Sequence, residues 1–141
     1  MCMLLYIASE VALRTIPWNE SSPSFHVDTL RESTGSAAVV HHFSKRHVYV
    51  VGSAEKCACA FEANLDREPH ELSDREVAVE ALRQYLSEAA VHSPIELYAC
   101  WAGDEALPPQ HRRPLHTESA PKSAFSFVPR TFLHVPRRSA A

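Results

Sequence analysis

One amphipathic segment, with short apolar runs before and after it, constrains the fold of this chain more than any other feature. Ser73 and Glu76 fit a capping box, with the serine at the N-cap, the glutamate at N3 and an acidic first turn. Apolar residues then recur at helical spacing: Val79, Leu82, Leu86 and Ala89. The pattern predicts one principal helix over residues 74–91, with a single buried face.

The apolar runs around this helix predict strands. Residues 3–8 are apolar throughout, as in a strand covered on both faces, and residues 47–51 and 95–101 are rich in β-branched and aromatic side chains. Residues 57–62 are expected to pair with 47–51 as a hairpin, and residues 37–43 fit either a strand or a short helix.

Two further apolar patches, residues 125–128 and 131–135, are bounded by prolines and are expected as edge strands. The order of strands, helix and strands indicates an α/β fold of the α+β type. We expect a mixed, largely antiparallel sheet of four to six strands, with the principal helix packed on one face.

Composition divides the chain into two parts. With 141 residues, 45% of them apolar, the chain is long enough for one ordinary core. Residues 1–105 are predicted to form a single globular domain. Six of the ten prolines lie in residues 105–141, which hold 6 basic against 2 acidic residues, whereas residues 1–104 hold 8 against 15. Residues 106–141 are therefore expected to be a Pro-rich basic segment that packs on the same domain.

Charge and hydropathy exclude several classes of protein. No apolar run approaches the roughly 20 residues of a membrane span, and residues 1–10 have no basic region of a signal peptide. We therefore expect a cytoplasmic protein that does not associate with a membrane. Its four cysteines are then expected to be free, metal-bound or catalytic rather than disulfide-bonded. The acidic body argues against nucleic acid as a partner, because such binding depends on neutralising phosphates.

Cys57 and Cys59 form the arrangement with most potential chemistry. They stand two residues apart, just after a predicted strand, where two thiolates can converge on one metal ion. A tetrahedral zinc site needs further ligands, and Cys100, Cys2 or one of three histidines (His41, His42 and His47) would supply them. Thiolate ligands also suit copper(I).

Two other interpretations of the cysteine pair stay open. Lys56 beside Cys57 would favour a reactive thiol, whereas cysteines are also common as small buried packing residues. Cys2 would be an N-terminal nucleophile if Met1 were removed, but we favour its role as the start of a buried strand.

Gly52 and Gly103 each close a predicted strand, and strand ends are where ligands bind in α/β sheets. Gly52 and Ser53 lead to the cysteine pair, while Gly103 stands between Trp101 and two carboxylates, Asp104 and Glu105. If the two strand ends lie side by side, these groups share one rim, with Trp18 as a wall.

The resulting hypothesis is a thiol- or metal-centred site. Its catalytic candidates are Cys57, Cys59, Asp104 and Glu105, with the carboxylates handling protons. Its binding candidates are Trp18, Gly52, Ser53, Trp101 and Gly103. Its metal candidates are Cys57, Cys59, Cys100 and His47, with zinc as the cofactor. The alternative is a non-enzymatic interaction module with the cysteines as core packing, which binds a protein partner or forms a homo-oligomer through a sheet edge.

Overall fold

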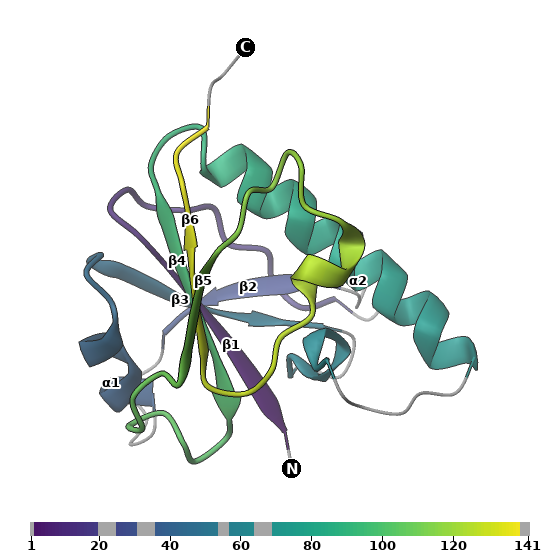
Figure 1. Ribbon diagram of the computed structural model, residues 1–141, viewed down its shortest axis with the longest axis horizontal. Coiled ribbons are helices and arrows are strands. Elements are labelled where there is room, and N and C mark those ends of the chain that lie inside the picture. The colour runs from purple at the N-terminus through teal and green to yellow at the C-terminus, as the bar shows by residue number, and fades with distance from the viewer. Residues whose placement is uncertain (1, 20–24, 31–35, 54–56, 64–68, 139–141) are drawn as a thin grey trace.

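The computed structural model describes residues 2–19, 25–30, 36–53, 57–63 and 69–138, and within them six strands form one open sheet (Figure 1). The strands are β1 (Met3–Ser9), β2 (His26–Thr29), β3 (His47–Gly52), β4 (Ile95–Trp101), β5 (His111–Pro114) and β6 (Thr131–Val135). Their order is β2-β3-β1-β4-β6-β5. Every strand pair is antiparallel except β5 with β6, which confirms the predicted mixed, largely antiparallel sheet.

One long helix, α2 (Pro69–Ala89), covers one face of the sheet, as predicted (Figure 1). The apolar stripe is buried as the spacing required: Val79, Leu82, Leu86 and Ala89. The predicted start is wrong, because the helix begins at Pro69 and Ser73 lies inside it. Proline is well suited to a first helical turn, which needs no backbone donor at that point.

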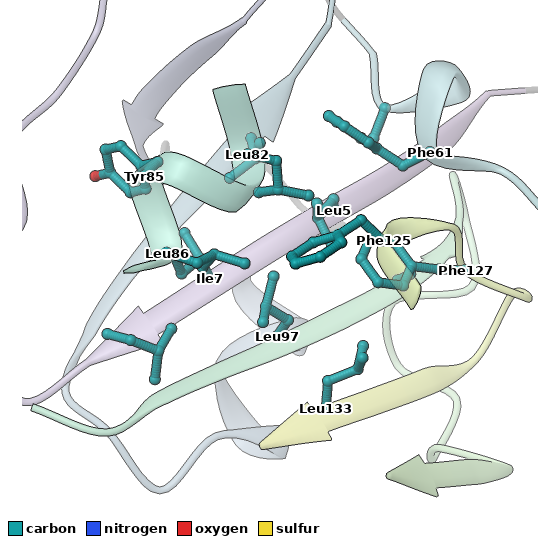
Figure 2. Packing of buried hydrophobic residues seen from close by; sticks show 14 of the residues in the cluster. Leu5, Ile7, Phe61, Leu82, Tyr85, Leu86, Leu97, Phe125, Phe127 and Leu133 are labelled. Atoms are coloured by element: carbon teal, nitrogen blue, oxygen red, sulfur yellow. The ribbon is translucent and has the colours of Figure 1, made fainter. Parts of the chain in front are cut away.

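Figure 2 shows the core between α2 and the sheet, where aromatic rings fill the space beside the leucines of the helix. Phe61, Phe125 and Phe127 are fully buried there and come from outside the regular strands. Burying a side chain of this size contributes about 1.5–3 kcal/mol of transfer free energy. Residues 106–138 therefore contribute side chains to this core, in addition to forming the strands β5 and β6.

The opposite face of the sheet carries a second, smaller cluster. Its buried members are Tyr6, Val39, Tyr98, Cys100 and Phe132. Val39 ends the short helix α1 (Ser36–Val39), and the 3-10 turn η1 (Val40–His42) follows directly. Residues 37–42, which fitted either a strand or a helix, are therefore helical.

Three local predictions differ from the structure. Residues 57–62 are not a strand but a bend followed by the 3-10 turn η2 (Cys59–Phe61), because the amide of Ala58 donates to the carbonyl of Met3 (2.9 Å) rather than pairing with β3. Residues 125–128 begin with the last residue of η3 (Lys122–Phe125) and form a single bridge, between Phe127 and Glu62. Strand β6 is not an edge strand, because β5 pairs along its outer side.

No helix in the described part of the chain is long and apolar enough to cross a membrane.

Candidate metal centre

The C-terminal ends of β3 and β4 lie at the same end of the sheet, on either side of the start of β1. Val51 pairs with Leu5, and Trp101 pairs with Met3, in two antiparallel ladders that share β1. The segments that follow β3 and β4 therefore both emerge beside Cys2. The sequence pattern predicts the candidate site at this end of the strands.

Hydrogen bonds fold the segment after β3 back onto β1. The Ser53 hydroxyl and amide both donate to the carbonyl of Cys57, at 2.8 and 2.7 Å. The amide of Ala58 then donates to the carbonyl of Met3 at 2.9 Å, and the amide of Met3 donates to Cys59 Sγ at 3.5 Å. The buried Ser53 thus holds the backbone of Cys57 in place through two hydrogen bonds.

Cys2 completes a group of three thiols. The amide of Ala102, just after β4, donates to the Cys2 carbonyl at 2.8 Å and so holds Cys2 beside the end of β4. The Sγ atoms of Cys2, Cys57 and Cys59 all lie within 4.8 Å of one another, and those of Cys57 and Cys59 are 3.0 Å apart. Cys57 is buried, Cys59 is half-buried and Cys2 is exposed, so an ion can enter from solvent.

The spacing of the sulfur atoms fits a thiolate metal centre. A zinc–sulfur bond of about 2.3 Å in a tetrahedron places two sulfur atoms roughly 3.8 Å apart. Three sulfur atoms within 4.8 Å can meet this requirement with small side-chain rotations. Within the described residues the group offers three ligands, so a zinc ion held there would have a fourth position open, as in catalytic rather than structural zinc sites.

The protonation state of the Cys57 thiol distinguishes a role as metal ligand from a role as catalytic nucleophile. Burial, together with the side-chain hydrogen bond to Cys59, raises the pKa of Cys57 to about 12. A thiol with this pKa is protonated at neutral pH and is a poor nucleophile. A bound cation would instead supply the charge that stabilises its thiolate.

The other two metal candidates lie away from the three thiols. Cys100 points to the opposite face of the sheet, in the cluster with Tyr6 and Tyr98. Burial, with a smaller contribution from the Glu105 and Asp104 carboxylates, raises its pKa to about 12. His47 pairs with Ser9, at the far end of β1 from Met3, a separation of about 20 Å for six residue steps along a strand.

The carboxylate candidates belong to a tight turn after β4. Gly103 has a φ of +100°, a backbone conformation that favours glycine, and its amide donates to the buried Glu105 side chain. His42 Nε2 lies 2.7 Å from the carbonyl oxygen of Glu105. The amide of Asp104 donates to the carbonyl of Trp101 at 3.0 Å. The His42 ring in turn lies against Tyr98 of the smaller cluster, with 4.9 Å between ring centroids, so this turn adjoins that face of the sheet.

Of the remaining binding candidates, Gly52 and Trp101 pack against neighbouring residues, and Trp18 lies near the β2 edge of the sheet. The His26 ring lies against Gly52, its partner across β2 and β3, so closely that a Cβ atom on Gly52 would collide with it. Trp101 is half-buried against the main core. Trp18 is half-buried two residues after Ile16, which pairs with Val27 at the β2 edge.

A groove that the sequence pattern did not indicate lies between α2 and the segment after β1. It has a volume of about 450 Å³ and is lined by Val11, Ala12, Leu13, Arg14, Tyr85, Glu88, Ala89 and His92. Arg14 and Glu88 form an ion pair across it at 3.6 Å. The Tyr85 hydroxyl donates to the carbonyl of Arg14 at 2.6 Å. Only the packing of two distant segments creates this groove, so periodicity gives no sign of it.

Comparisons with protein-family models, curated proteins and solved structures give no match. The chemistry of the site therefore has to be argued from its geometry. Sequence spacing identified Cys57 and Cys59, and it ranked Cys2 only among several possible further ligands. The central position of β1 in the sheet is what brings Cys2 to the pair.

Proposed function

We propose that this protein binds one thiophilic metal ion, foremost Zn²⁺, through Cys2, Cys57 and Cys59. The observation that carries the proposal is the approach of three sulfur atoms to within 4.8 Å from two segments far apart in the sequence. Thiolates are preferred ligands of zinc and copper(I).

The open coordination position supports zinc chemistry beyond a structural role. A water molecule bound there would face solvent beside the exposed Cys2, where a substrate could displace it. A zinc ion held there would supply Lewis-acid chemistry to a group in the open position, while its three thiolates, which outweigh the charge of the ion, would leave a bound water less acidic than in a histidine site. The protonated Cys57 favours this role over a free thiol nucleophile.

Metal binding would also link two parts of the fold. Cys2 belongs to the start of the central strand, and Cys57 and Cys59 belong to the segment that packs Phe61 into the core. A ligand that binds only the folded state stabilises it by about 2.7 kcal/mol at a hundredfold excess over its dissociation constant. Zinc should therefore raise the melting temperature of the reduced protein.

The test is metal content and thiol accessibility of untagged protein. We expect about one metal ion per chain, with the reactive thiols masked until a chelator is added. Loading reduced, metal-free protein with Zn²⁺ or with copper(I) in separate arms identifies the preferred ion. Cys59→Ser should abolish binding, whereas Cys100→Ala is the matched control, because that thiol lies on the other face of the sheet. Equal loss of metal in both variants, or no binding of either ion, would refute the proposal.

The alternative function, an interaction module with its cysteines as packing, rests on the exposed sheet edge at β5. That strand has four residues and includes two arginines and Pro114, features that discourage pairing between edges. The same samples test this alternative by sedimentation. A metal-free protein that associates with increasing concentration would favour the interaction module.

A further inference from the structure

The three thiols of the candidate metal centre differ in their access to solvent. Cys2 is exposed, Cys59 is half-buried and Cys57 is buried, while their Sγ atoms all lie within 4.8 Å of one another. A dissolved oxidant therefore reaches Cys2 first, and two further thiols stand beside the sulfur that it oxidises. Cysteines that are oxidised reversibly are typically exposed and lie next to a second cysteine that resolves them. The arrangement of Cys2 with its two neighbours has both of these properties.

Hydrogen bonds hold Cys59 beside Cys2. The amide of Met3, the residue after Cys2, donates to Cys59 Sγ at 3.5 Å, and the Cys57 thiol donates to the same sulfur atom at 3.0 Å. The amide of Ala58 donates to the carbonyl of Met3 at 2.9 Å, so the two chain segments run side by side. Backbones joined in this way lie about 5 Å apart, and the Cα atoms of a disulfide are about 4.4–6.8 Å apart. A bond between Cys2 and Cys59 therefore suits the spacing of the two segments.

The two sulfur atoms that lie closest together are less suited to such a bond. Cys57 and Cys59 have only Ala58 between them, so a disulfide would close a small ring that contains two planar peptide units. Disulfide geometry is specific, and departures from it store strain that makes the bond easier to reduce. A bond from Cys2 to Cys59 joins segments far apart in the sequence and has no such constraint. It also closes a long loop, which stabilises the folded state.

We infer that peroxides oxidise this group of thiols to a disulfide between Cys2 and Cys59. The Cys2 sulfur attacks one oxygen of hydrogen peroxide, the O–O bond breaks, and the thiol becomes a sulfenic acid as one water molecule leaves. The Cys59 sulfur then attacks the Cys2 sulfur, and the S–O bond breaks. The released hydroxyl group takes the proton of the Cys59 thiol and leaves as a second water molecule. The peroxide thus gains the two electrons that the two thiols lose.

The same reaction releases a bound metal ion, a consequence that rests on the proposed function. Zinc binds thiolates, and the disulfide consumes two of the three thiols that would supply them. Cys57 alone remains, so the oxidised protein loses the ion. A thiol reductant reverses the oxidation by thiol–disulfide exchange and restores all three ligands. Metal binding at this end of the sheet is therefore regulated by the balance between peroxide and thiol reductant.

Peptide mapping of the metal-free protein tests the disulfide by itself. The reduced protein is treated with hydrogen peroxide, its remaining thiols are alkylated, and it is digested with trypsin. The digest contains peptide 1–14, which holds Cys2, and peptide 57–67, which holds the other two thiols of the group. We expect these two peptides to be linked. Fragmentation of the linked peptides between Cys57 and Cys59 should place the bond on Cys59.

Two matched variants repeat this assignment. Cys59→Ala should abolish the link, whereas Cys57→Ala should keep it, and circular dichroism checks the fold of both. Cys100→Ala is the control, because that thiol is fully buried on the other face of the sheet and its removal should leave the link unchanged. The inference is overturned if the bond lies on Cys57, or if Cys2 is oxidised to a sulfinic acid while the two peptides stay unlinked.

A parallel sample of zinc-loaded protein separates this inference from the proposed function. Zinc should appear in solution, where a chromophoric chelator detects it, as the link between the two peptides forms. A link in protein that never binds zinc would refute the proposed function alone. Zinc binding without a link, or zinc that stays bound to the linked protein, would refute the present inference alone.

Discussion

The Sγ atoms of Cys57 and Cys59 lie 3.0 Å apart, whereas side chains two positions apart on one strand are separated by roughly 6–7 Å. The difference arises because the chain bends at Cys57 and enters a 3-10 turn at Cys59. The same bend turns both thiols toward Cys2. A regular hairpin at this position would have kept the two sulfur atoms too far apart for one ion.

The exposed Cys2 offers the cleanest test of the metal centre. Cys2→Ser removes one ligand without disturbing the core, so the free energy of unfolding of the metal-free protein should change by less than about 0.5 kcal/mol. Zinc affinity should fall roughly 100-fold, because zinc sites gain about 10–16 kcal/mol from a full set of ligands. Competition with a chromophoric chelator measures the affinity, and urea titration measures the stability. Unchanged affinity would show that Cys2 is not a ligand.

Zinc binding should release protons. The pKa of Cys57 is about 12, so this thiol is protonated across the range from about pH 6 to pH 8 and must lose its proton to bind the ion. The apparent affinity should therefore rise at least about tenfold per pH unit over this range. Calorimetry in buffers of different ionisation enthalpy counts the protons. Affinity that is independent of pH would contradict thiolate ligation.

Several parts of the fold followed from local patterns alone. The strands at residues 3–9, 47–52 and 95–101 and the buried stripe of α2 are set by side-chain polarity and periodicity, which are local properties. The start of α2 was misplaced because a capping box can occur inside a helix when earlier residues extend it.

Other parts depend on contacts between distant segments. β5 has the sequence His111-Arg112-Arg113-Pro114, which carries no apolar alternation, and it forms only because β6 offers a free edge. The group of three thiols likewise needs Cys2 and Cys57 to meet across 55 positions. The sequence spacing pointed to two of the three thiols that the fold brings together, but it could not single out Cys2 among the other cysteines and the histidines.

Gly52 is required by its neighbour rather than by its backbone angles. A Cβ atom there would collide with the His26 ring, so Gly52→Ala should destabilise the protein by about 1–3 kcal/mol. In a double-mutant cycle, His26→Ala should recover most of this loss, because it removes the obstructing ring. Gly103→Ala is the control, since its cost comes from a φ of +100° in open space and should be unaffected by His26→Ala. Additive effects of Gly52→Ala and His26→Ala would contradict this explanation.

Phe127 tests how far the basic segment is part of the core. Its ring is fully buried beside Phe61, and its amide donates to the Phe61 carbonyl at 2.6 Å. Phe127→Ala should therefore cost about 3–5 kcal/mol, the usual loss for a buried aromatic residue. Val128→Ala is a matched control in the same segment, because that side chain is exposed and should change stability by less than about 0.5 kcal/mol. A small loss of stability for both variants would show that this segment is not part of the core.

Stability should fall in alkaline solution because two buried thiols stay protonated in the folded state. The pKa values of Cys57 and Cys100 are raised from 9.0 to about 12, chiefly by burial. Between these values the unfolded chain loses protons that the folded chain keeps, so stability is complete below about pH 9 and declines above it. The expected slope is about 1.4 kcal/mol per pH unit for each thiol. Above about pH 10, Tyr85 adds to it in the same direction, since burial raises its pKa to about 12.

Urea titrations of the reduced, metal-free protein at a series of alkaline pH values measure this slope. Cys100→Ala removes one of the two thiols and should roughly halve the slope between about pH 9 and pH 10, before Tyr85 contributes. The comparison uses slopes because the substitution also removes packing and lowers stability at every pH. An unaltered slope would mean that the Cys100 thiol ionises in the folded state as readily as in the unfolded chain.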